Sequence, residues 1–249
     1  MRSSSFPPPD SFSNKPVAPW LCERPYAHRG LHGAGAPENS RSAFQAAITA
    51  GIGIELDVRL SRDGFAVVFH DADLARMTGI AVPVAKRTVA DLATMRLAGS
   101  ADRIETLAQT LSFIAGRAPV LIELKTDGNP HVAARLSLSV RHALEGYRGL
   151  AAVMSFDPAV ARWFGAHAPR VARGLVVGEM RGLQGMLRLR LCLRVGRPHF
   201  LACDLSTLSS RIVRTVRARG MPVLAWTVRS DAEEIRARAM SDQIIFENV

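Results

Sequence analysis

From Pro25 onward, short apolar runs alternate with longer segments whose apolar positions recur every three or four residues. The short runs are typical of strands buried in a parallel sheet, and the longer segments are typical of helices. The predicted core strands are residues 26–29, 54–58, 120–125, 151–156, 174–177, 200–204, 223–228 and 243–246. The helices expected between them are residues 40–50, 88–96, 107–116, 131–144, 158–167, 183–195, 208–219 and 231–239. Eight core strands, mostly separated by helices, in a chain of this length predict an α/β fold, a single TIM (β/α)8 barrel.

Two segments fall outside this regular order. After the second strand, Asp63-Gly64 is a turn signal and residues 65–70 form a returning apolar run, which predicts a hairpin-like insertion. Residues 1–24 are rich in Ser and Pro and are expected to be a disordered lead-in to a single domain over residues 25–249. The chain has no apolar stretch typical of a secretory signal or a membrane span, so a cytoplasmic location is the default expectation.

The net charge of +10 raises the question of a nucleic-acid partner. The chain has 32 basic residues, of which only Lys15, Lys86 and Lys125 are lysines, and the arginines are spread over its whole length. A nucleic-acid binder more often has a clustered basic face with interleaved aromatic rings, so no such partner is expected. Three cysteines without a CxxC spacing predict neither a disulfide framework nor a zinc site.

Acidic residues stand inside two of the predicted strands. Glu55 and Asp57 are two positions apart, which puts both side chains on one face of their strand, and Glu123 and Lys125 repeat this spacing. All lie near the carboxyl ends of strands, where barrel active sites are built. The alternative is a set of surface ion pairs, but the neighbouring residues are apolar core residues. Three converging carboxylates therefore predict a site for a hard cation such as Mg²⁺ or Ca²⁺.

Two histidines end apolar runs close to these acids. His28 lies at the end of the first strand and His70 ends the returning run of the insertion. A single histidine is more often structural, but two at strand ends beside carboxylates favour a general acid/base pair. Arg29 and Lys125 would offer positive charge to a phosphoryl oxygen, for which a compact lysine ammonium is well suited. No role is predicted for the remaining histidines, His32, His131, His142, His167 and His199.

Several short motifs, weak one by one, become specific through their order and spacing. They are His28-Arg29-Gly30, Pro37-Glu38-Asn39-Ser40, Glu55-Leu56-Asp57-Val58, Asp63-Gly64, His70-Asp71 and Ile122-Glu123-Leu124-Lys125, followed by SFDP at 155–158 and AWTV at 225–228. This pattern resembles the glycerophosphodiester phosphodiesterase family from about Tyr26 to the C-terminus. The resemblance implies a TIM-barrel enzyme that hydrolyses glycerophosphodiesters to sn-glycerol 3-phosphate and an alcohol.

The same resemblance implies a role for each matching residue. The metal ligands would be Glu55, Asp57 and Glu123, holding a divalent cation, Mg²⁺ before Ca²⁺. The acid/base pair would be His28 and His70. The substrate contacts would be Arg29, Lys125 and Trp226, the last as an apolar wall. Supporting residues would be Glu38 and Asn39. Two positions depart from the pattern, namely Phe246-Glu247 where Thr-Asp is frequent and Glu105 where Pro is common.

Some questions stay open at this level. A lipid-directed phosphodiesterase of the same fold, acting on lysophospholipids or phosphoinositides, is the main alternative, and a non-catalytic binding module is disfavoured because every site residue is present. The nucleophile is either water or the glycerol 2-hydroxyl, the latter through a cyclic phosphate. The sequence does not decide which histidine is the acid, which alcohol leaves, which metal is native or what the oligomeric state is.

The segment 182–197 combines leucines with arginines and contains no acidic residue. Read as a helix, it has an apolar stripe formed by Leu183, Leu187, Leu191 and Val195. A different face is expected to carry Arg190, Arg194 and Arg197. The favoured interpretation packs the stripe against the barrel strands and leaves the arginines in solvent. The alternative is a weak and reversible contact of the basic face with an anionic membrane surface.

Overall fold

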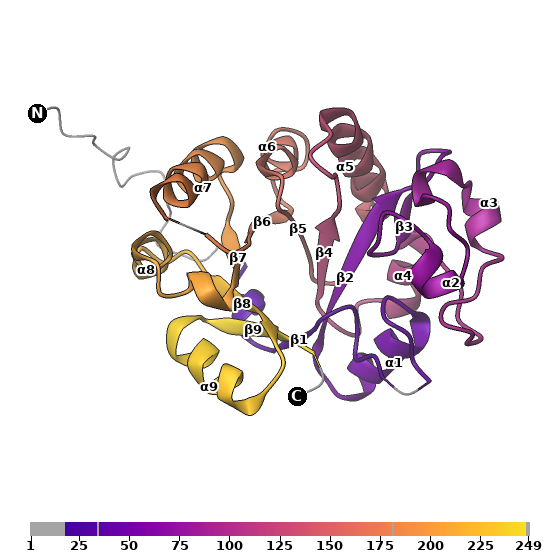
Figure 1. The fold of residues 1–249 in the computed structure, drawn as a ribbon, viewed down its shortest axis with the longest axis horizontal. Coiled ribbons are helices and arrows are strands. Elements are labelled where there is room, and N and C mark those ends of the chain that lie inside the picture. Colours follow the sequence, from indigo (N-terminus) through magenta and orange to yellow (C-terminus); the bar gives the residue numbers. More distant parts are fainter. Residues whose placement is uncertain (1–17, 34, 181, 248–249) are drawn as a thin grey trace, which may run out of the picture.

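Eight parallel strands close on themselves into a barrel, because the first strand pairs with both the second and the last (Figure 1). The computed structural model describes residues 18–33, 35–180 and 182–247. The barrel strands are β1 (Tyr26–Ala27), β2 (Gly53–Leu60), β4 (Val120–Leu124), β5 (Ala151–Ser155), β6 (Ala172–Val177), β7 (Phe200–Asp204), β8 (Val223–Val228) and β9 (Gln243–Phe246). At the point of closure, Tyr26 lies opposite Gly53 on one side and Ile245 on the other. The predicted TIM barrel is confirmed.

Helices surround the strands and begin at polar caps. The outer helices are α1 (Arg41–Thr49), α4 (Leu107–Ile114), α5 (Pro130–Leu144), α6 (Pro158–His167), α7 (Gly182–Gly196), α8 (Arg211–Ala218) and α9 (Asp231–Met240). The Ser40 side chain accepts a hydrogen bond from the Ala43 amide, and Asn129 and Asp157 cap α5 and α6 in the same way. The predicted helix 208–219 is shorter, because residues Leu205–Thr207 form a separate 3₁₀ turn before α8.

The insertion after β2 is present as expected. Strand β3 (Ala66–Val68) runs antiparallel to β2, and α2 (Ala75–Thr78), a 3₁₀ turn (Val84–Lys86) and α3 (Val89–Leu92) follow it. Phe69, Leu74 and Leu92 belong to an apolar cluster of its own. The predicted helix 88–96 is wrong in length: it begins with a capping box at Thr88 but ends at Leu92, because the chain turns away toward an isolated strand bridge at Arg96.

Inside the barrel, large rings are accommodated by glycines on the neighbouring strands. The interior cluster includes Tyr26, Leu121 and Phe200, all fully buried. A Cβ at Gly53 would lie 2.5 Å from Cδ1 of the Tyr26 ring, so only glycine leaves room for this tyrosine. Gly174 makes room for Phe200 in the same way. The interior positions nearer the carboxyl ends of β2 and β4 are polar, and they form the site described below.

The amino ends of the strands are covered by a segment that was expected to belong to a disordered lead-in. Residues 1–17 of the predicted lead-in 1–24 lie outside the described residues. The remainder is ordered: Pro19–Cys22 forms a 3₁₀ helix, and the Leu21 side chain is only 1% exposed in the interior cluster. Gln243 donates a side-chain hydrogen bond to the Cys22 carbonyl, which ties this segment to β9. The barrel domain therefore begins before Pro25.

Helix α7 packs against the barrel with the face opposite to the one that was predicted to pack there. Leu183, Leu187 and Leu191 are 68%, 55% and 62% exposed, so the predicted packing of this leucine stripe on the strands is wrong. Leu189 is instead buried against the barrel, and Met186 and Leu193 pack beside it and are partly buried. These positions are three, four and seven residues apart, which is the spacing of one helix face. None of the described helices is long and apolar enough to cross a membrane.

Candidate active site

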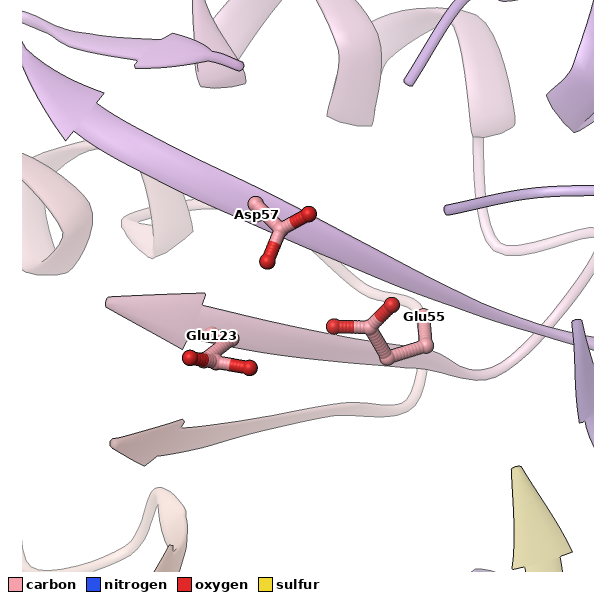
Figure 2. A group of neighbouring side chains, drawn as sticks. All are labelled: Glu55, Asp57 and Glu123. Atoms are coloured by element: carbon pink, nitrogen blue, oxygen red, sulfur yellow. The ribbon is translucent and has the colours of Figure 1, made fainter. Parts of the chain in front are cut away.

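Three carboxylates gather inside the barrel near the carboxyl ends of β2 and β4. Figure 2 shows Glu55 and Asp57 on one strand and Glu123 on its neighbour, with their carboxylates facing a common space. Asp57 lies directly opposite Glu123 in the strand pairing. One carboxylate oxygen from each residue lies within 4.8 Å of the others, and the residues are 1%, 0% and 7% exposed. The predicted convergence of these three acids is confirmed.

Two cationic side chains reach into this cluster. The Lys125 Nζ atom lies 2.5 Å from Glu123 Oε1 and 3.0 Å from Asp57 Oδ1. The Arg29 backbone amide donates to Glu55 Oε2 at 2.9 Å, and its Nε atom lies 3.3 Å from Asp57 Oδ2. Three buried carboxylates thus face two cations, so with all three ionised the cluster would have more negative charge than these two side chains neutralise.

Burial and mutual repulsion perturb the acids unequally. Burial raises the pKa of Glu55 well above its usual value, and the neighbouring Asp57 and Glu123 raise it further. Burial also raises the pKa of Glu123 to about 7, although Lys125 opposes this shift. Burial opposes ionisation of Asp57 too, but Lys125 and Arg29 are close enough to hold its pKa below the usual value. Asp57 is therefore the acid whose negative charge the site stabilises most.

The donor atoms fit a hard divalent cation. The buried Glu55 Oε1 atom accepts no hydrogen bond from any described residue, whereas the Lys125 ammonium lies 3.0 Å from Asp57 Oδ1. Burying such atoms without partners is unfavourable unless another positive group satisfies them. An all-oxygen set of carboxylates is the chemistry that Mg²⁺ and Ca²⁺ prefer, and Mn²⁺ shares it, whereas zinc sites favour histidine and cysteine.

The loop after β1 is shaped to support this cluster. Arg29 and Asn39 have φ values of 57° and 55°, and Gly30 has 82°, where an added Cβ would lie 2.9 Å from Ala43 Cβ. This left-handed geometry folds the loop against the end of β2. Asn39 Nδ2 donates to Asp57 Oδ2 at 2.9 Å, and the Asp57 amide donates to Asn39 Oδ1 at 3.1 Å. Asn39 therefore contacts a candidate metal ligand, as the sequence analysis expected of a supporting residue.

Glu38 belongs to a chain of ion pairs that joins the loop to the insertion. It accepts from Arg29 Nη1 at 2.8 Å and from Arg76 Nη2 at 2.7 Å. Arg76 also donates to Asp71 at 2.6 Å, and Asp71 lies 2.7 Å from the Nδ1 atom of His70. Arg76 was not predicted, because it lies in α2 and only the folded insertion brings it to Glu38. The carboxylate partner of His70 could have been found in the sequence, because Asp71 directly follows this histidine.

His28 has a carboxylate partner from the other end of the chain. Its Nδ1 atom lies 3.4 Å from Glu247 Oε2, and His32 Nε2 lies 3.3 Å from Glu247 Oε1. The interaction with His28 contributes most to lowering the pKa of Glu247 to about 2. His32 was predicted to have no role, yet it shares this carboxylate. A carboxylate at Nδ1 of His28, as at His70, favours the proton on that nitrogen and leaves Nε2 as the acceptor.

Two aromatic rings border the cationic side of the site. The rings of Trp226 on β8 and Phe156 after β5 meet edge to face, with centroids 5.6 Å apart. Lys125 Nζ lies 6.0 Å from the Phe156 centroid, so this pair adjoins the charged cluster. Phe156 is 48% exposed. Phe156 therefore lies beside Trp226, the residue expected to form an apolar wall, and its only sequence signal was its place in the SFDP motif.

Comparison with known proteins agrees with this geometry. The sequence profile of the Glycerophosphoryl diester phosphodiesterase family matches residues 28–248. The chain is 30% identical over 130 residues to the glycerophosphodiester phosphodiesterase of Bacillus altitudinis, covering 49% of this chain and 53% of that protein. It is 32% identical over 120 residues to the rat (Rattus norvegicus) lysophospholipase D GDPD1, covering 43% and 37%. The alignments thus span about half or less of these curated relatives.

Solved structures share the whole fold. A phosphodiesterase from Oleispira antarctica, determined with the product sn-glycerol-3-phosphate, superimposes with a TM-score of 0.79 at 24% identity, covering 92% of this chain and 94% of that one. The glycerophosphodiester phosphodiesterase of Thermotoga maritima gives 0.71 at 26% identity, covering 89% and 92%. Since the family profile covers nearly all of the barrel, the chain belongs to the glycerophosphoryl diester phosphodiesterase family.

Proposed function

We propose that the protein hydrolyses glycerophosphodiesters to sn-glycerol 3-phosphate and an alcohol, with a divalent cation and two histidines as the reacting groups. The observation that carries this proposal is the buried carboxylate cluster, in which Glu55 Oε1 has no hydrogen-bond partner among the described residues, bordered by two cations. A phosphodiester is an anion whose charge grows during hydrolysis, so a site with cationic groups fits it. The free thiols Cys22, Cys192 and Cys203 favour a reducing, cytoplasmic setting for this activity.

Glu55, Asp57 and Glu123 would hold the cation, for which Mg²⁺ is the first choice and Ca²⁺ the second. When bound, the cation supplies positive charge that polarises a phosphoryl oxygen. Arg29 and Lys125 add positive charge to the non-bridging oxygens from the protein side. Both side chains are held near the carboxylates by short contacts, which limits their freedom before substrate binds.

The two histidines carry the proton transfers. Nε2 of one accepts the proton of the nucleophile as its oxygen bonds to phosphorus, and the other donates a proton to the leaving alkoxide as the P–O bond breaks. The carboxylates of Asp71 and Glu247 lie beside the Nδ1 atoms of His70 and His28 and orient the two rings. Attack by water gives the products directly, whereas attack by the glycerol 2-hydroxyl gives a cyclic phosphate that water then opens. The direct route uses this pair of proton transfers once, whereas the cyclic route uses it twice, with the roles of the two histidines exchanged in the second step.

A lysophospholipid is the second candidate substrate. The exposed Phe156 ring and the adjoining Trp226 offer apolar area at the border of the site. One relative of this chain is named a lysophospholipase D, and it is 32% identical over the matched 120 residues. A substrate with an acyl chain at the glycerol would place apolar surface against such rings.

A hydrolysis screen distinguishes these candidates. The purified chain is incubated with glycerophosphocholine, glycerophosphoethanolamine, glycerophosphoglycerol and lysophosphatidylcholine, and both phosphate-bearing and alcohol products are identified by mass spectrometry. We expect sn-glycerol 3-phosphate with the free head group from the first three. Lysophosphatidic acid as the dominant product would establish the second candidate instead. His28→Ala and His70→Ala should be strongly impaired, whereas His131→Ala, a matched control at an exposed position of α5, should retain full activity.

A further inference from the structure

Helix α7 carries an exposed apolar face. The side chains of Leu183, Leu187 and Leu191 are all more than half exposed, although leucine is a large apolar side chain of the kind that is usually buried. Within the described part of the chain, no other helix exposes more than one large apolar side chain to this degree. Contiguous exposed apolar surface on a water-soluble barrel marks a place where another surface binds.

Arginines lie among these leucines and not on a separate face. Residues three and four apart are neighbours on a helix surface, so Arg190 and Arg194 lie beside Leu187 and Leu191. Arg188 borders Leu191 from the other side, and all three arginines are exposed. The predicted separation of a leucine stripe from a basic face is therefore wrong. We call these six side chains (Leu183, Leu187, Leu191, Arg188, Arg190 and Arg194) the α7 outer face.

The charge of this region is strongly one-sided. Between residues 158 and 230 the sequence has thirteen arginines and two acids, Glu179 and Asp204. Asp204 accepts hydrogen bonds from Ser206 at the cap of a 3₁₀ turn. No described acidic residue forms an ion pair with any of the three arginines on the α7 outer face. The face therefore offers positive charge and apolar area together, which complements a surface that is anionic outside and apolar within.

A second copy of this chain is a poorer partner for the same face. An isologous dimer through α7 would bring the arginines of one copy against those of the other. Like charges facing each other across an interface oppose association. A phospholipid surface has no such conflict, because arginine side chains reach phosphate groups while their stems cover apolar surface.

The position of α7 relates the outer face to the site. The helix follows β6, so its first turn, with Leu183, lies at the carboxyl end of the barrel strands. This is the end that carries the carboxylate cluster. Figure 1 shows α7 on the outside of the barrel between α6 and α8. A surface bound along α7 would therefore lie beside the opening of the barrel without covering it.

We propose that the α7 outer face binds reversibly to an anionic phospholipid surface. The leucines enter the boundary between head groups and acyl chains, and the arginines bind lipid phosphates. Each arginine adds about fivefold to partitioning, so the three together add about 100-fold. The outer face has no aromatic anchor, which makes the contact shallow and sensitive to salt. This proposal does not depend on the hydrolytic activity.

Vesicle sedimentation tests it on the full chain. The probes are vesicles of phosphatidylcholine alone and of phosphatidylcholine with about one quarter phosphatidylglycerol, each at low and high salt. We expect binding to the anionic vesicles only, reduced by salt. The triple variant Arg188→Gln/Arg190→Gln/Arg194→Gln should lower the partition coefficient by about 100-fold. The triple variant Leu183→Gln/Leu187→Gln/Leu191→Gln should lower it at least about tenfold.

Two controls make the result decisive. Ile235→Gln removes an apolar side chain that is 72% exposed on α9, and it should leave vesicle binding unchanged. Hydrolysis of soluble glycerophosphocholine should be equal in all variants, which separates this test from that of the proposed function. Failure to bind anionic vesicles, equal binding to neutral ones, or binding that survives both triple variants would overturn the proposal. The proposal would also be overturned if the wild-type protein were a dimer in solution and the leucine variant were a monomer, because the face would then bind a second copy of the chain.

Discussion

The loop that supports the carboxylate cluster depends on one asparagine. Asn39 is 5% exposed, has a φ of 55° and makes two buried hydrogen bonds to Asp57. We predict that Asn39→Ala destabilises the protein and impairs the site together. Asn39→Gly removes the same side-chain bonds but tolerates the left-handed backbone, so the two variants separate hydrogen bonding from conformation.

The expected loss in the free energy of unfolding follows from these contacts. The bond to the Asp57 carboxylate has a charged acceptor and contributes about 1.5–3 kcal/mol, and the Asp57 amide, left buried without a partner, costs about 1–3 kcal/mol. Alanine at a left-handed φ adds about 1–2 kcal/mol that glycine does not. Asn39→Ala should therefore lower the free energy of unfolding by about 4–8 kcal/mol in total and Asn39→Gly by about 1–2 kcal/mol less.

Urea unfolding monitored by circular dichroism measures both values, and steady-state hydrolysis of glycerophosphocholine measures the effect on the site. Loss of a group that orients a metal ligand typically reduces activity by about 10- to 100-fold. A loss of less than about 1 kcal/mol for Asn39→Ala would show that the loop does not depend on these bonds. If glycine were no better than alanine, the conformational part of the reasoning would be wrong.

Further predictions concern the histidines and the barrel interior. His28→Ala and His70→Ala should each lower kcat by about 10²–10⁴ with an unchanged circular dichroism spectrum, and near-normal turnover would exclude that residue from proton transfer. Gly53→Ala places a Cβ 2.5 Å from the Tyr26 ring and should cost about 1–3 kcal/mol in urea unfolding. Tyr26→Phe removes a buried hydroxyl that bonds to no described residue, so stability at pH 7 should be equal or higher. Because burial raises the pKa of Tyr26, the unfolded chain ionises first above about pH 10. Wild-type stability should therefore fall there more steeply than that of Tyr26→Phe, and parallel pH profiles would contradict this.

The sequence predicted the barrel because its strands are short apolar runs and its helices repeat their apolar positions every three or four residues, signals that are local in the chain. It also predicted the meeting of Glu55, Asp57 and Glu123, since the carboxyl ends of neighbouring parallel strands must share one end of a barrel. Both predictions required only knowing which segments are strands and in which order they follow along the chain. The supporting loop was placed through the resemblance of its motif and not through any periodicity.

Other contacts could not be predicted because they depend on tertiary geometry. Glu247 meets His28 across the closure of the barrel, and Arg76 reaches Glu38 only after the insertion has folded. The orientation of α7 was misjudged because leucines occupy both of its faces. Leu189 is buried and Leu191 is exposed, so residue type alone does not indicate which face packs against the strands.

The central claim is that a cation held by the carboxylate cluster and two histidines together hydrolyse a glycerophosphodiester. The most direct measurement is the rate of sn-glycerol 3-phosphate release from glycerophosphocholine, in excess chelator and after readdition of Mg²⁺ or Ca²⁺, for the wild type and for Glu123→Gln. We expect that chelation abolishes release by the wild type, that one of these cations restores it, and that Glu123→Gln stays inactive at cation concentrations that saturate the wild type. Full activity in excess chelator, or a fully active Glu123→Gln variant, would contradict it.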